Sequence, residues 1–373
     1  MFIKSFVVLL FFFLASGTDL LCASTTADRL DDRNLSARMS VYLYPRTVAD
    51  IEEFDLSLLG AGDSAPVELI YWAVGFKRES DGTVKAYQKS HNPDQDNEPF
   101  DTPANIILKM FERFPEARGY HHTWLLDTCL NKHARLMDEM RLLESFNEEQ
   151  RRLLVRDVVN TFGVLAEETE HRPRAISVDI EPICQPDGSD SLLGFHSDLV
   201  TAINNELSIP VSVHMSCSKI HDWLIDPSRN TNAYHEFTRL VDAIRMHPQS
   251  YLIIDAYCHG NSCEHQLNGA CVSCQDDHFT SLHKLQAIFR IFTDMEIPFK
   301  TVLSISGSSS GGRTLTGWCL ENFRQSLARI KSGVDLTSPY LRGFAFYGVG
   351  SERRITGDLG SVLGALIDEG FVG

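Results

Sequence analysis

The sequence has few basic residues, and after its first residues it has no hydrophobic run long enough to cross a membrane. It carries 34 lysines and arginines against 50 aspartates and glutamates, which gives a formal net charge of −16 at pH 7. Nucleic acids and anionic membrane surfaces both need a basic binding face, so this balance argues against either as a partner. A membrane-spanning helix needs roughly 18 consecutive apolar residues, and no later segment reaches that length.

The N-terminal residues have the pattern of a secretory signal. Lys4 is the only early cation, residues 6–15 are an unbroken apolar run, and a small-residue cleavage site follows near Cys22-Ala23-Ser24. We therefore expect residues 1–23 to be a signal peptide and residues 24–38 to be a polar leader. The mature protein is expected to be soluble and secreted or extracytoplasmic.

The cysteine count is consistent with an exported chain. Of the nine cysteines, Cys22 lies in the expected signal, so eight remain, an even number that predicts disulfides in an oxidising compartment. Four of them form the pattern Cys258-x4-Cys263-x7-Cys271-x2-Cys274, which would indicate a zinc site in a cytosolic protein. In an exported protein we expect disulfides here instead, with the pairing open, and we expect no metal or other cofactor.

Strand-like and helix-like segments alternate from about residue 39 to the C-terminus. The strand candidates are residues 40–44, 67–76, 122–127, 175–181, 211–216, 251–257, 301–305 and 342–347. The amphipathic helix candidates between them include residues 148–168, 192–207, 233–246, 281–295 and 317–330.

Eight strand candidates that alternate with helices predict parallel pairing in a (β/α)8 TIM barrel. We expect the barrel to occupy residues 39–373 as a single, disulfide-containing domain. An open doubly wound sheet is the alternative, but no glycine-rich dinucleotide turn follows the first strand candidate.

The segment with most chemical content is residues 175–182, Ala-Ile-Ser-Val-Asp-Ile-Glu-Pro. Side chains alternate across a strand, so Asp179 and Glu181 would share one face, roughly 6.5 Å apart along the chain. Two neighbouring carboxylates suit acid–base catalysis, because one can stay ionised while the pKa of the other is raised. A structural role, in which Asp179 pairs with His214 or an arginine, is the alternative.

Function in a barrel collects at the C-terminal ends of the strands. Besides Asp179 and Glu181, those ends carry polar and aromatic side chains that would suit a sugar-binding cleft. They are Tyr44, Trp72, Phe76, Asp127, His214, Ser216, Asp255, Tyr257, His259, Ser304, Ser306 and Tyr347.

The Asp-Ile-Glu strand resembles the end of the Asp-x-x-Asp-x-Asp-x-Glu signature of chitinase-like family 18 glycoside hydrolases. The resemblance implies Glu181 as general acid and Asp179 as the carboxylate that orients a substrate N-acetyl group for attack. Tyr257 would match the tyrosine that steadies this group, and Tyr347 lies where the family has a floor tryptophan.

The chain also departs from that family. The first two aspartates of the signature fall on Arg174 and Ser177, and Asp255-Ala256-Tyr257 reverses the family's order of tyrosine and aspartate. The Asp-x-Glu strand is similar as well to that of family 25 lysozymes, which also act on N-acetylated sugars.

The sequence therefore predicts a secreted, monomeric glycoside hydrolase whose catalytic residues are Glu181 and Asp179 and whose partner is a carbohydrate substrate. The expected substrate-binding residues are Tyr257, Asp255, His214, Asp127, Trp72 and Tyr347. One alternative is a metal-dependent hydrolase or phosphodiesterase whose ligands would be Asp127, Asp179, Glu181, His214, Asp255 and His259. Another is a barrel that binds glycans without turnover, which is plausible because Arg174 and Ser177 stand where the family signature has its first two aspartates.

Overall fold

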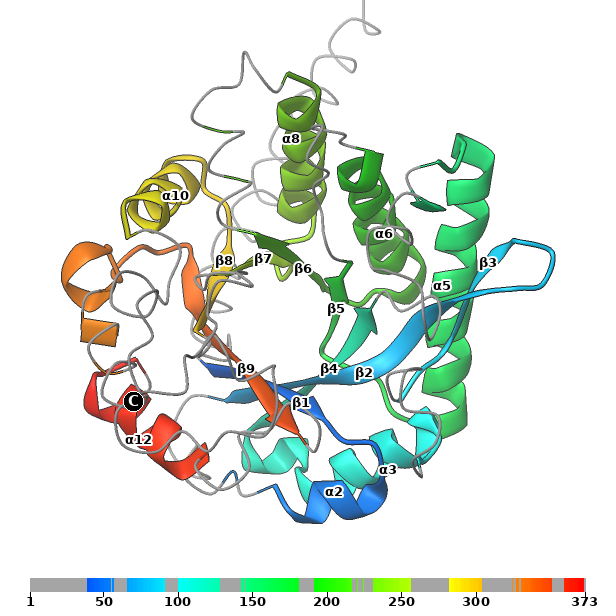
Figure 1. Ribbon diagram of the computed structural model, residues 1–373, viewed down its shortest axis with the longest axis horizontal. Helices are drawn as coiled ribbons and strands as arrows, with labels where there is room; N and C mark the ends of the chain where they lie inside the picture. Colours follow the sequence, from blue (N-terminus) through cyan, green and yellow to red (C-terminus); the bar gives the residue numbers. More distant parts are fainter. Residues whose placement is uncertain are drawn as a thin grey trace, which may run out of the picture. The chain divides into compact units, whose positions relative to one another are not determined.

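The strands of this chain form one sheet that closes on itself (Figure 1). The computed structural model describes residues 39–54, 56, 66–90, 100–127, 142–143, 145–180, 191–216, 220, 224, 231–255, 282–303, 324, 327–328, 330–350 and 359–371. The expected signal peptide and leader, residues 1–38, lie outside these ranges, and so do all eight cysteines of the expected disulfides.

The strands are β1 (Met39–Tyr44), β2 (Val67–Arg78), β3 (Val84–Gln88), β4 (Tyr120–Asp127), β5 (Ala175–Asp179), β6 (Val211–Ser216), β7 (Tyr251–Asp255), β8 (Phe299–Leu303) and β9 (Leu341–Gly350). The α-helices are α2 (Val48–Glu52), α3 (Pro103–Arg113), α5 (Glu148–Thr169), α6 (Ser191–Leu207), α8 (Thr231–Met246), α10 (Leu282–Asp294) and α12 (Leu359–Asp368), and a 3-10 turn, η4, spans Glu116–Arg118.

The strand order confirms the expected barrel. It runs β1-β9-β8-β7-β6-β5-β4-β2-β3, and an additional pairing between β1 and β2 closes the circle. Every pair around that circle is parallel, whereas β3 pairs with β2 in the antiparallel sense. The closed part therefore has eight parallel strands, and β3 extends from it as the second arm of a hairpin (Figure 1).

Strand alternation divides the buried side chains into two layers. Side chains from four other strands, Ser40, Thr123, Tyr251 and Lys300, contact the side chain of Glu68 on β2. The faces of the strands that carry these residues must therefore point into the barrel. The same parity places one apolar group inside, namely Tyr42, Tyr44, Ile70, Trp72, Leu125, Tyr251, Ile253, Val302 and Ala345. The opposite faces, with Val178 and Ile180 among them, join the larger core that packs beneath the helices.

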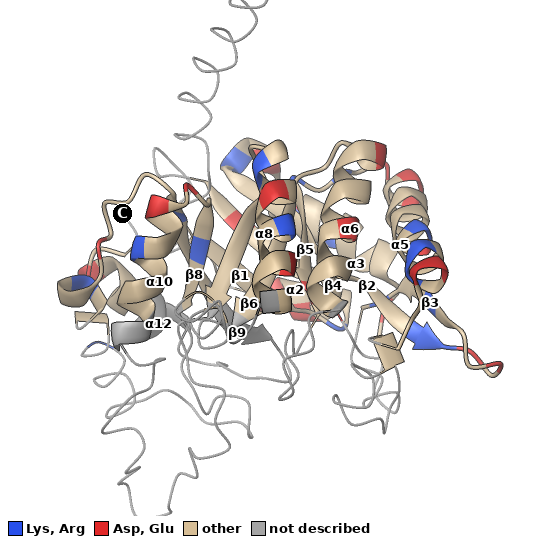
Figure 2. Ribbon diagram, turned by 90° about the horizontal axis from the view of Figure 1, so that it is seen from above, with Lys and Arg blue, Asp and Glu red and all other residues tan. Residues whose placement is uncertain are grey.

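The outer helices begin with identifiable caps. Asn147 forms a capping box with Gln150 at the start of α5, and Thr102 caps α3 just before Pro103. Acidic and basic residues are interspersed along helices such as α5 and α8 (Figure 2). Within the described ranges, no helix combines the length and the apolar character needed to cross a bilayer.

Element boundaries differ from expectation in places that matter for the site. The strand expected over residues 175–181 is β5, which ends at Asp179, and Glu181 lies outside the described residues. The strand expected over residues 301–305 is β8, which begins earlier, at Phe299. The hairpin strand β3 and the helices α3 and α12 were not expected, and most of the helix expected over residues 317–330 lies outside the described residues.

Candidate active site at the carboxyl ends of the strands

Two carboxylates stand side by side at the C-terminal ends of β4 and β5. Asp127 and Asp179 are register partners, and residues opposite each other in a parallel pair point to the same side of the sheet. Both share the parity of the interior side chains, so they lie at the C-terminal mouth of the barrel. The structure thus brings together two of the residues that the sequence singled out.

Asp179 is fixed by His214 of β6. The Nδ1 atom of His214 lies 2.7 Å from Oδ1 of Asp179, and the side chains of His214 and Asp179 are 1% and 10% exposed. Because a carboxylate oxygen only accepts, Nδ1 of His214 carries the proton and donates it. The pairing that the sequence allowed as a structural alternative is therefore present. Among the described residues, no partner contacts Oδ2 of Asp179, so one oxygen remains available.

Asp127 has a partner of its own, Lys89, which the sequence reasoning missed. The ammonium of Lys89 lies 2.8 Å from Oδ2 of Asp127 and 4.8 Å from the centre of the Trp72 ring. Each of the two neighbouring carboxylates thus has a separate donor, which reduces their mutual repulsion.

Aromatic side chains form the wall next to this pair. The rings of Tyr44 and Trp72 meet edge to face, with centroids 4.8 Å apart. The Trp72 side chain is largely buried, and its Nε1 has no hydrogen-bond partner within the described part of the chain. Phe76 had been expected in the same wall. It lies instead in the outer core and contacts Phe195 of α6, because a β-bulge between Trp72 and Val74 reverses the parity of β2.

Tyr42 and His196 complete the surroundings of the Asp179–His214 pair. The Tyr42 ring lies inside the barrel, 6.1 Å from the ring of His214, and burial raises its pKa, so the phenol stays neutral. Burial lowers the pKa of His196 to about 4, and its Nδ1 bonds to the carbonyl of Leu192 at 2.5 Å. His196 is therefore a neutral core histidine.

The remaining expected site residues are described only in part. Asp255 ends β7 and Tyr347 lies in β9, so their backbones stand at the same end of the barrel, but their side chains are outside the description. Glu181, Tyr257 and His259 lie wholly outside the described residues. No group of three or more possible metal ligands occurs within the described ranges.

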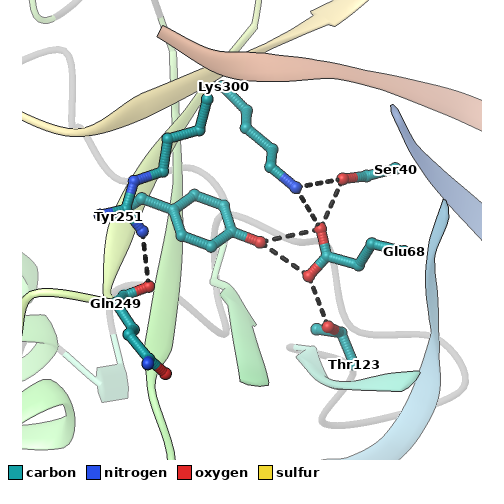
Figure 3. Close-up of polar contacts among 7 residues, drawn as sticks. Ser40, Glu68, Thr123, Gln249, Tyr251 and Lys300 are labelled. Carbon is teal, nitrogen blue, oxygen red and sulfur yellow. Dashed lines mark hydrogen bonds and ion pairs between the residues drawn. The ribbon is translucent and has the colours of Figure 1, made fainter. Parts of the chain in front are cut away.

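A buried polar cluster, the floor cluster, occupies the barrel interior near the N-terminal ends of the strands and consists of Ser40, Glu68, Thr123, Tyr251 and Lys300 (Figure 3). Glu68 accepts hydrogen bonds at 2.5 Å from the hydroxyls of both Ser40 and Thr123. The Tyr251 hydroxyl lies 2.7 and 2.9 Å from the two carboxylate oxygens. The Lys300 ammonium lies 2.6 Å from Oε2 of Glu68 and 2.8 Å from the Ser40 hydroxyl.

The floor cluster holds an ion pair without access to water. Burial alone would raise the pKa of Glu68, but the Lys300 charge and the hydroxyl donors lower it to about 2. Burial also lowers the pKa of Lys300, against the attraction of Glu68. Four donors are directed at the Glu68 carboxylate. This geometry therefore supports an ionised Glu68 paired with a protonated Lys300. Side chains at the N-terminal end of a barrel generally serve stability rather than catalysis, so the candidate site is the one at the opposite end.

No family model and no curated protein matches this chain. Among solved structures, the spore cortex-lytic enzyme SleL of Bacillus megaterium QM B1551 is 12% identical, with 90% of this chain and 74% of that chain covered and a TM-score of 0.48. A family GH18 chitinase from Chromobacterium violaceum is 10% identical, with coverages of 90% and 84% and a TM-score of 0.46. A GH53 catalytic domain from Ignisphaera aggregans is 12% identical, with 85% of each chain covered and a TM-score of 0.42. At these values the likenesses say nothing of the activity, and the barrel rests on the strand order itself.

Proposed function

We propose that this protein is a secreted glycoside hydrolase that acts on N-acetylated glycans, with Glu181 as general acid and Asp179 as the carboxylate that orients the substrate. The observation that carries the proposal is the state of Asp179. One of its oxygens is fixed by the buried His214, and the other has no partner among the described residues. A carboxylate held in this way can receive a substrate N–H without first reorganising.

The proposed chemistry divides the work between two carboxyl groups. Glu181, two residues beyond Asp179, donates its proton to the glycosidic oxygen as the bond to the anomeric carbon breaks. The carbonyl oxygen of the substrate's own acetamido group attacks that carbon, and the positive charge that spreads onto the acetamido nitrogen is stabilised by Asp179. Water then opens the cyclic intermediate, with Glu181 acting as the base.

The neighbouring side chains support a sugar ligand. Asp127 offers a second carboxylate beside Asp179, and the buried rings of Tyr44 and Trp72 form the apolar wall next to this pair. His214 acts through Asp179, because its Nδ1 donates a hydrogen bond to that carboxylate.

The test is the turnover of fluorogenic glycosides and polymeric glycans by wild type, Glu181→Gln and Asp179→Asn. Glutamine keeps the size of Glu181 but has no proton to donate, so the rate should fall by roughly 10²–10⁴. Asparagine at 179 can still accept from His214 but lacks the negative charge, so kcat should fall by about 10²–10³. Glu149→Gln, on the exposed face of α5, is the matched control and should leave the rate unchanged.

The outcomes separate the candidate functions. Activity on an N-acetylhexosaminide that collapses in both site variants supports the proposal. Turnover indifferent to both variants would move the site elsewhere on the barrel. Glycan binding without turnover in any variant would instead identify a glycan-binding barrel, and activity that chelation abolishes would identify a metal-dependent hydrolase.

A further inference from the structure

Lys89 is a buried cation next to the site that the proposed mechanism does not use. Its side chain is 1% exposed, although lysine is among the residue types that are almost never fully buried unless paired. It directly follows β3, and its backbone N–H donates to the carbonyl of Ala73 on β2 at 2.8 Å. The hairpin of β2 and β3 therefore delivers this ammonium to the C-terminal end of the barrel.

The barrel wall leaves a slot for the Lys89 side chain at Gly75. A Cβ atom on Gly75 would lie 2.5 Å from Cδ and 3.3 Å from Cβ of Lys89, closer than side-chain atoms can pack. Gly75 stands in register with Asp127, just after the bulge in β2. The glycine is thus needed for the close approach of the lysine stem rather than for backbone freedom.

Two side chains from two strands hold the Lys89 ammonium in place. Oδ2 of Asp127 lies 2.8 Å from Nζ, and the ring of Trp72 lies beneath Nζ at 4.8 Å from its centre. An ammonium above an indole face adds a cation–π attraction to the ion pair.

The Asp127 side chain, by contrast, is only partly buried. Its side chain is 24% exposed, and within the described residues Oδ1 has no hydrogen-bond partner. One oxygen is therefore fixed by Lys89, while the other is available, as for Asp179 and His214 in the next strand. The two carboxylates present the same arrangement side by side.

Stability alone does not account for this arrangement. Transfer of an ammonium out of water carries a large desolvation cost, and replacement of a buried ion pair by apolar side chains is often neutral or stabilising. The attraction between Lys89 and a partly exposed carboxylate such as Asp127 offsets only part of this desolvation cost. What the arrangement provides is a carboxylate with one fixed orientation.

We propose that Lys89 is a positioning residue of the glycan site, an inference that rests on the function proposed above. Lys89 engages Oδ2 of Asp127, so that Oδ1 accepts a hydrogen bond from a hydroxyl or an acetamido N–H of the sugar unit bound at the partly exposed Asp127. Asp127 then contributes to substrate affinity, whereas Asp179 and Glu181 carry the chemistry.

The test is a double-mutant cycle of Lys89→Met, Asp127→Asn and the double variant, assayed on the best substrate of the glycoside panel. A charge-assisted hydrogen bond contributes enough that each single variant should raise KM by about tenfold or more, with kcat changed by less than about threefold. The double variant should be no worse than Asp127→Asn alone, because the lysine acts through that carboxylate. Lys85→Met, an exposed lysine on the same hairpin, is the matched control and should leave KM unchanged.

A loss of folding and a loss of substrate affinity are distinguished in the same set of variants. Urea unfolding of each variant identifies loss of structure, and Asp127→Asn, isosteric and partly exposed, tests the acceptor even if Lys89→Met folds poorly. A folded Lys89→Met or Asp127→Asn enzyme with unchanged KM, or a double variant with additive effects, would overturn this inference and leave the proposed function intact. Wild-type protein that neither cleaves nor binds any glycan would overturn both, and that result is visible before any variant is made.

Discussion

Glu68→Gln should destabilise the protein strongly while leaving the carboxyl ends of the barrel strands unchanged. The substitution removes the counter-charge of Lys300, whose ammonium is buried and lies 2.6 Å from Oε2 of Glu68. The pKa of Glu68 is lowered from 4.5 to about 2. This difference is worth about 3 kcal/mol of unfolding free energy at neutral pH, at roughly 1.4 kcal/mol per pKa unit. Loss of one partner from a buried ion pair typically costs about 3–5 kcal/mol, which agrees.

The assay is urea unfolding followed by circular dichroism at pH 7. Glu68→Gln/Lys300→Met should recover part of the loss, because it removes the unpaired ammonium while the glutamine carbonyl can still accept from neighbouring hydroxyls. Glu168→Gln, on the exposed side of α5, should fall within about 0.5 kcal/mol of wild type. A loss below about 1 kcal/mol for Glu68→Gln, or no recovery in the double variant, would refute the reasoning.

The same pair sets a pH dependence with a definite sign. Because the folded-state pKa of Glu68 is lowered, the unfolded chain binds its proton more readily. The stabilisation is therefore complete above the unfolded value near 4.5 and is lost as the pH falls from there to about 2. In Glu68→Gln this part of the acid sensitivity should be absent, as measured by urea midpoints at a series of pH values.

Two further predictions concern the layers around the barrel. His122, bonded to Tyr71 and to the carbonyl of Phe114, has its pKa lowered to about 4 by burial. A histidine NMR titration, assigned through His122→Gln, should show a neutral ring down to that pH. Stability should fall as the pH drops from about 6.5 towards 4, because the unfolded histidine binds the proton first; a pKa near 6.5 would refute the burial argument. Asn147→Ala removes the cap of α5 and should cost about 1 kcal/mol in urea unfolding, whereas Asn147→Asp should not; equal losses would show that the cap is not the cause.

The sequence predicts the barrel well because strand alternation is a local property. In β6, the run Val-Ser-Val-His-Met-Ser by itself separates the inward Ser212 and His214 from the outward Val213, and the contact between His214 and Asp179 agrees with that reading. The alternation signal weakens where a strand ends. Residues 175–181 continue the pattern for two positions beyond the observed end of β5 at Asp179, so the shared face assigned to Asp179 and Glu181 stays a prediction.

The hairpin strand β3 was missed although a signal for it exists. Asp81-Gly82 is a turn signature between two strand-like runs, and Gly82 has a φ of 86°, which favours glycine. Without the hairpin, Lys89 looks like an ordinary solvent-exposed lysine. The burial of its side chain follows from the slot at Gly75, which depends on the bulge in β2, and neither has a reliable local signature.

The floor cluster could not be predicted from local patterns at all. Glu68 and Lys300 are 232 residues apart in the chain, and each by itself looks like a charged residue near the start of a strand. Their pairing follows only when the barrel is closed and the strand registers are known. Long-range polar contacts of this kind need the tertiary structure, whereas Asp179 and His214 could be considered together because they end neighbouring strands.

The distance along the chain between Glu68 and Lys300 also governs how the protein can be made. The ribosome releases β1, β2 and β4 long before β8, so during synthesis the Glu68 carboxylate has no ammonium to neutralise it. An early half-barrel would have to bury that charge alone or keep its interior open to water. The closed barrel therefore becomes favourable only once β8 has emerged, and a fragment that ends before residue 300 should remain dependent on chaperones rather than fold by itself.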